Sequence, residues 1–97
     1  MEVKTKSGFK FDLDERILDD WRVIRALGRA DKAPKPEDRL AGIVDLVSLI
    51  FGSDEDRLIE HLQSKNDGYV PTEALKEEIL SVFTRAKAAK NSQASQA

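Results

Sequence analysis

The sequence predicts a mainly α-helical fold: a small bundle of about four helices with a short N-terminal β-hairpin and a disordered C-terminal tail. Apolar residues recur every three or four positions through most of the chain, and strict alternation is confined to residues 2–11. Proline and glycine separate the helical stretches. The 97 residues suffice for one compact domain, residues 1–89, whereas residues 90–97 are small and polar with nothing to bury.

Residues 2–11 predict the hairpin, because Val3 and Thr5 alternate with charged residues before a Ser7–Gly8 turn. Phe9 and Phe11 resume the alternation after the turn. So small a hairpin is stable only when its apolar side packs on another element.

The first helix is predicted over residues 12–30, with Asp12 or Asp14 as its N-cap. Its apolar stripe is formed by Leu13, Ile17, Trp21, Ile24 and Leu27. Asp20 falls on the same stripe. Burying an unpaired carboxylate is costly, so we expect Asp20 to lie at the edge of the stripe and to reach water rather than to be buried with a specific partner.

The second helix is predicted over residues 37–51, after a break at Pro34 and Pro36 and before a stop at Gly52. A broad core stripe is assigned to Leu40, Ile43, Val44, Val47, Ile50 and Phe51. Leu46 and Leu49 lie away from that stripe. A helix that is apolar on more than one side is either central in its domain or buried in an interface, and both interpretations stay open.

Two further helices are predicted, one capped by Ser53 and one over residues 73–89 capped by Thr72. Their inward residues are Leu58, Ile59 and Leu62, then Leu75, Ile79, Val82 and Ala86.

The segment that connects these two helices, residues 64–75, resembles half of a calcium-binding EF-hand loop. With Gly68 at the sixth position, however, the ligand positions fall on Gln63, Lys65, Asp67 and Ala74, of which only Asp67 is a normal ligand. The segment is therefore predicted to be a turn, in which Gly68 supplies a positive φ.

The composition disfavours several classes of function. Lysine and arginine total 16 against 18 acidic residues, and no basic block stands out, so nucleic-acid binding is not expected. There is no cysteine, which fits a reducing compartment. No segment reaches the ~20 apolar residues of a membrane span, and the first residues contain no apolar core of a secretion signal, so a cytoplasmic location is expected.

No arrangement of residues indicates an enzyme, a cofactor or a metal site. The single histidine, His61, has neither a second histidine nor a cysteine to act with, and is expected at the surface or its boundary. The adjacent acids Asp19–Asp20 and Glu77–Glu78 point in different directions on a helix and are expected to be solvated.

The order of these features resembles the small tail assembly chaperones of bacteriophages with long flexible tails. The likeness runs from "GFKFDLDE" and "ILDDWRVIRAL" through "IVDLVSLIFG" and "SDEDRLIEHL" to "DGYVPTEALKEEILSVF". It implies a helical protein without a cofactor that binds the tape-measure protein, keeps it soluble and promotes polymerisation of the tail-tube protein around it. It also implies self-association, and in this family a longer product often arises by ribosomal frameshifting, for which Ala89–Lys90–Asn91 could be the site.

Binding an aggregation-prone helix requires an apolar groove or face. The first candidates for that face are Gly42, Leu46 and Leu49, and the second are Leu18 and Val23, which lie off the first helix's stripe. The opposing interpretation is that these residues fill the domain's own core. The alternative function is a small cytosolic helical adaptor or regulatory protein.

Overall fold

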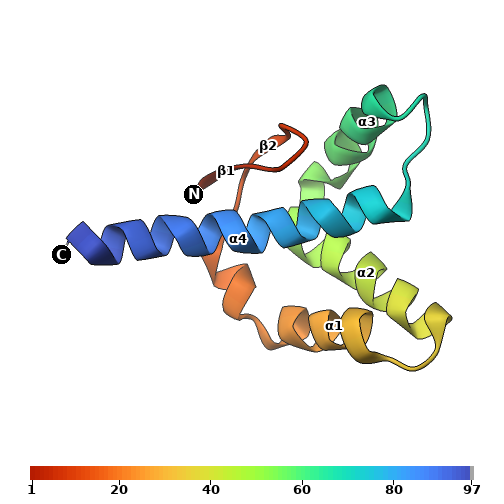
Figure 1. Ribbon diagram of the computed structural model, residues 1–97, viewed down its shortest axis with the longest axis horizontal. Coiled ribbons are helices and arrows are strands. Elements are labelled where there is room, and N and C mark those ends of the chain that lie inside the picture. Colours follow the sequence, from red (N-terminus) through yellow and green to blue (C-terminus); the bar gives the residue numbers. More distant parts are fainter. Residues whose placement is uncertain (97) are drawn as a thin grey trace.

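The computed structural model describes the backbone of residues 1–96 and the side chains of residues 1–89. In chain order its elements are β1 (Glu2–Lys4), β2 (Lys10–Asp12), η1 (Glu15–Asp19), α1 (Trp21–Lys32), α2 (Pro36–Phe51), η2 (Gly52–Asp54), α3 (Glu55–Lys65) and α4 (Thr72–Gln96), where η marks a 3₁₀-helix. Figure 1 shows α4 as the longest element, with α1 on one side of it and the hairpin and α3 on the other. The mainly helical character and the N-terminal hairpin are confirmed.

The hairpin packs its apolar side against the C-terminal end of α2. β1 and β2 are antiparallel, with Val3 opposite Phe11, and Gly8 in the turn has a φ of +91°. The rings of Phe11 and Phe51 are 4.8 Å apart, and Phe9 stacks on Phe11. This contact with α2 gives a two-stranded sheet the support that it would lack in isolation.

The segment predicted as one helix from residue 12 is divided at Asp20, and this corrects the predicted stripe. Residues before the division form the short η1, and Asp20 has an extended backbone, with φ −75° and ψ 129°. A helix that restarts at Trp21 has a new phase, so Trp21 is 68% and Ile24 43% exposed, while Val23 and Ala26 are buried. Of the two predicted N-caps, Asp12 is wrong because it ends β2, and Asp14 is confirmed as a cap because its side chain caps η1.

α1 and α2 pack with their backbones in near contact at Gly42. A Cβ at Gly42 would lie 2.6 Å from the amide nitrogen of Ala30 and 2.8 Å from the carbonyl oxygen of Ala26. The bounds of α2 agree with the prediction, with Pro36 at its first turn. Its buried face differs, because Leu40 and Val44 are exposed. The buried residues are instead Gly42, Ile43, Leu46, Val47, Ile50 and Phe51.

The bundle was expected to contain about four helices, but α1, α2 and α4 form it and α3 does not, so the number is corrected to three. α1, α2 and α4 surround a common groove. α3 lies apart from that groove, and its buried Leu58 and Leu62 belong to the core near the hairpin. The Arg57 guanidinium donates a hydrogen bond of 3.0 Å to the carbonyl of Lys10 in β2, which ties α3 to the hairpin.

The ends of α3 and α4 differ in detail from the prediction. Ser53 lies inside η2 and caps nothing by its side chain, and Thr72 is the first residue of α4 rather than its cap. The turn after α3 is confirmed, with a φ of +89° at Gly68 and of +55° at Asp67. The last helix was predicted to end at residue 89, whereas the backbone of α4 continues to Gln96 through most of the tail that was predicted to be disordered, residues 90–97.

We expect Gly42→Ala to destabilise the fold by about 1–3 kcal/mol, because the new methyl group meets backbone atoms that cannot move independently. Gly28→Ala is the matched control, since nothing lies within 4 Å of a Cβ at Gly28. In the control, loss of a helical glycine should stabilise the protein by about 0.5–1 kcal/mol. Urea unfolding followed by circular dichroism measures both, and equal effects of the two variants would contradict the close contact at Gly42.

Candidate functional site

An apolar groove lies between α1, α2 and α4. Its volume is about 540 Å³. α1 and α4 form its walls, Ile43 and Leu46 of α2 line it between them, and Asp31 and Lys76 are its only charged lining residues. The lining residues are Ile24, Leu27, Gly28, Ala30, Asp31, Ile43, Leu46, Lys76, Ile79 and Leu80.

The α1 wall presents an apolar stripe to this groove. Ile24, Leu27 and Gly28 line it at the three- and four-residue spacing of one helix face, and Trp21 continues the same spacing one turn earlier. Gly28 has open space where a side chain would stand. The wall is therefore lowest at Gly28, where the backbone of another helix could approach closely.

Three of the five predicted partner-binding residues are core residues. Gly42 and Val23 are buried at the packed faces of α2 and α1, and Leu46 is only 1% exposed. Leu18 and Leu49 are half-buried and pack against the core. The burial of Val23, Gly42 and Leu46 agrees with the opposing interpretation, that these residues fill the domain's own core, although Leu46 also lines the groove.

Large apolar residues on the stripe of the first predicted helix were expected to be buried, and the structure partly reverses this. Ile24 was assigned to the core and stands in the groove wall, where it is 43% exposed. Leu80 of α4, 59% exposed in the opposite wall, was not singled out. Leu80 lies two residues from both Glu78 and Val82. Its exposure could have been predicted from the sequence, because Leu80 is a large apolar residue off the predicted stripe of the last helix.

A second cluster joins the hairpin to α4 through the buried carboxylate of Glu78. The hydroxyls of Thr5 and Ser7 donate to Oε1 at 2.7 and 2.5 Å, and the Ser7 amide donates to Oε2 at 3.2 Å. His61 Nε2 lies 3.1 Å from both the carbonyl oxygen and Oγ of Ser7. The expectation that Glu78 is solvated is wrong, because it is only 2% exposed.

The arrangement of Ser7, His61 and Glu78 does not match a catalytic triad. In a triad the carboxylate orients the imidazole, which in turn accepts the serine proton. Here the carboxylate contacts Ser7 directly, and no described acid bonds to His61. The cluster instead holds the hairpin turn against α4 and α3. His61 is half-buried, and its ring packs on Phe9, which agrees with the predicted boundary position.

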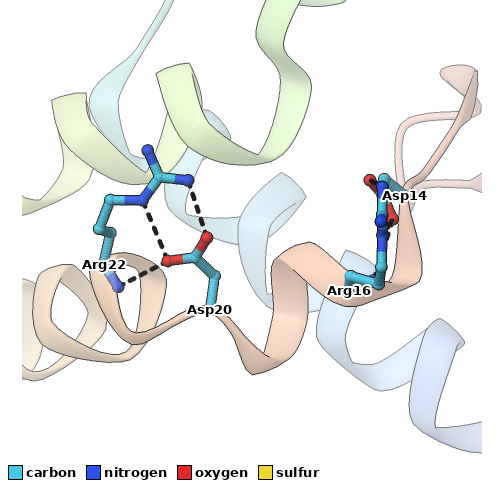
Figure 2. A network of polar contacts seen from close by, with 4 residues as sticks. All are labelled: Asp14, Arg16, Asp20 and Arg22. Carbon is cyan, nitrogen blue, oxygen red and sulfur yellow. Dashed lines mark hydrogen bonds and ion pairs between the residues drawn. The ribbon is translucent and has the colours of Figure 1, made fainter.

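Asp14 and Asp20 each cap a helix and bind the arginine two residues later, as Figure 2 shows. Asp20 accepts a hydrogen bond of 2.8 Å from the Arg22 amide and two from its guanidinium. These hydrogen bonds lower the pKa of Asp20 from 3.8 to about 2, and the bonds from the guanidinium have a larger effect than the bond from the amide. Arg16 lowers the pKa of Asp14 in the same way. Asp20 therefore has a specific partner while still reaching water.

Within the described residues, no helix has the length and apolarity needed to cross a bilayer. No cluster of three or more potential metal ligands occurs there either. Comparison of the chain with known protein families, curated proteins and solved structures found no match. The case for a function therefore rests on the groove and its surroundings.

We expect Asp20→Asn to make stability less dependent on pH. Because the pKa of Asp20 is lowered in the folded state, its carboxylate stabilises that state fully at pH values above about 3.8. This contribution is lost as the pH falls through about 2. Asparagine can still cap α1 but cannot form the ion pair with Arg22. Wild type should melt at a higher temperature than Asp20→Asn at neutral pH, and the two should converge in acid. A constant difference down to about pH 2 would contradict this assignment.

We expect Glu78→Ala to lower the free energy of unfolding by about 1–3 kcal/mol, chiefly because the buried Thr5 hydroxyl loses its acceptor, while the two Ser7 donors are only partly buried. Equilibrium unfolding in urea measures the loss. The adjacent Glu77→Ala, which removes an exposed carboxylate, is the control and should change stability far less. Equal stability of the two variants would show that the cluster does not hold the hairpin in place.

Proposed function

We propose that this protein is a holding chaperone of the tail-assembly type, whose groove binds an aggregation-prone helical segment of a tape-measure protein. Binding would keep that segment soluble until tail-tube subunits polymerise around it. The observation that carries the proposal is the apolar groove between α1, α2 and α4, with Ile24 and Leu80 exposed on opposite walls.

The shape and chemistry of the groove suit a helix. An amphipathic helix binds by laying apolar residues at three- and four-residue spacing into a groove. The α1 wall offers its own stripe at the same spacing, and Gly28 leaves room for close approach. Each Å² of apolar surface removed from water contributes about 25 cal/mol, so covering Ile24, Leu80 and Trp21 together would favour binding appreciably.

The exposed positions of the wall also allow binding to be separated from folding. Gly28 has no neighbour that a side chain would displace, and Leu80 is more than half exposed. Changes at either residue alter the groove without entering the core. Val44 of α2 provides the matched control, because it is 66% exposed and does not line the groove.

We expect Gly28→Leu and Leu80→Glu each to weaken binding roughly tenfold, or by about 1.4 kcal/mol, and so to lower the yield of soluble tape-measure fragment on co-expression. Gly28→Leu fills the groove, and Leu80→Glu places a charge on its apolar wall. Val44→Glu should solubilise the fragment as wild type does.

Thermal unfolding of each purified variant must accompany the co-expression. Folded Gly28→Leu and Leu80→Glu proteins that still solubilise the fragment would refute the groove as the binding site. A wild-type protein that does not solubilise any tape-measure fragment would refute the chaperone function and favour an adaptor role.

A further inference from the structure

The α1 wall of the groove is more basic than the chain as a whole. The protein has a net charge of −2, yet α1 carries one carboxylate, Asp31, and four cations. The cations are Arg22, Arg25, Arg29 and Lys32. Arg22 is held by Asp20 at 2.8 Å and Arg29 by Asp45 at 3.1 Å. Arg25 and Lys32 take part in no described ion pair.

Arg25 and Lys32, the two cations of α1 without a described ion pair, lie next to the groove wall. On a helix with 3.6 residues per turn, Lys32 follows Gly28 by four positions and therefore shares its side of α1. Arg25 precedes Gly28 by three positions and lies on the same side. Both side chains are exposed, so their charged groups can reach a helix lying in the groove.

The opposite wall also carries lysines, although the carboxylates of Glu73 and Glu77 lie on the same helix near them. Lys76, Leu80 and Lys87 recur along α4 at intervals of four and seven residues, which places them on one face. Lys76 lines the groove and pairs with Glu73 at 3.1 Å. Both members of that pair are well exposed, so the ion pair is weak and Lys76 can exchange it for a partner's carboxylate.

We propose that the groove selects an acidic amphipathic helix: an apolar face of residues at three- and four-residue spacing, flanked on both sides by aspartate or glutamate. This inference rests on the proposed function and specifies its partner. Arg25 and Lys32 on one rim and Lys76 and Lys87 on the other would attract those carboxylates and repel a basic helix. Nucleic acid is disfavoured because the lining between the rims is apolar and contains the carboxylate of Asp31.

Trp21 supplies a built-in probe for the test. It is the only tryptophan of the chain, is 68% exposed, and continues the stripe of the groove wall. Its fluorescence should shift to shorter wavelength when a helix covers it. The full-length protein is titrated with two peptides of about 18 residues, or five helical turns, with identical leucines and with either glutamates or lysines as flanking residues.

We expect the glutamate peptide to bind at least about tenfold more tightly than the lysine peptide, and its affinity to fall as salt is added. The double variant Lys76→Glu, Lys87→Glu should remove most of this preference. The control Lys4→Glu, Lys10→Glu makes the same change of net charge on exposed residues of the hairpin and should preserve it.

Each failure has its own signature. Equal affinities for the two peptides, with binding still blocked by Gly28→Leu, would overturn the charge selection and leave the chaperone proposal standing. An equal effect of the hairpin control would reduce the preference to net charge alone and overturn the inference. A single-stranded oligonucleotide that shifts Trp21 fluorescence as strongly as the glutamate peptide would also overturn it.

Discussion

The backbone contact between α1 and α2 at Gly42 determines how the rest of the molecule is arranged. Gly42 can approach Ala26 and Ala30 only because all three residues are small. Once that face of α1 is turned toward α2, Ile24 and Leu27 stand at its flank, beside α4. α4 packs beside them without covering them. The groove is therefore a geometric result of the close contact between α1 and α2 at Gly42.

Sequence periodicity predicted the hairpin, the bounds of α2 and the turn at Gly68 because each depends on local chemistry. It failed for α1 because a single helical phase was assumed across Asp20, where the extended backbone starts a new helix. It also gave priority to large apolar residues, whereas the closest packing uses Ala26 and Gly42. For these two reasons, residues predicted to lie in the core were found in the groove wall, and candidates for the partner-binding face were found in the core. No local sequence pattern would have shown that the small residues make the close contact.

The Glu78 cluster was beyond sequence analysis for a different reason. Thr5 and Ser7 are separated from Glu78 by 73 and 71 positions, so nothing near Glu78 marks it as buried. Two positions further along α4, Leu80 stands in the groove wall. One rigid helix thus connects the hairpin to the candidate site, and the placement of the hairpin contributes to the position of that wall.

Gly28 lowers the stability of α1, although nothing in the packing of the helices requires a glycine at this position. Its φ is not positive and no neighbouring atom excludes a side chain, so alanine would fit and would favour the helix. Directed evolution that rewards heat resistance alone should therefore replace this glycine early and begin to fill the groove. Selection in which client capture is also scored should retain it, so the two regimes would diverge first at this residue.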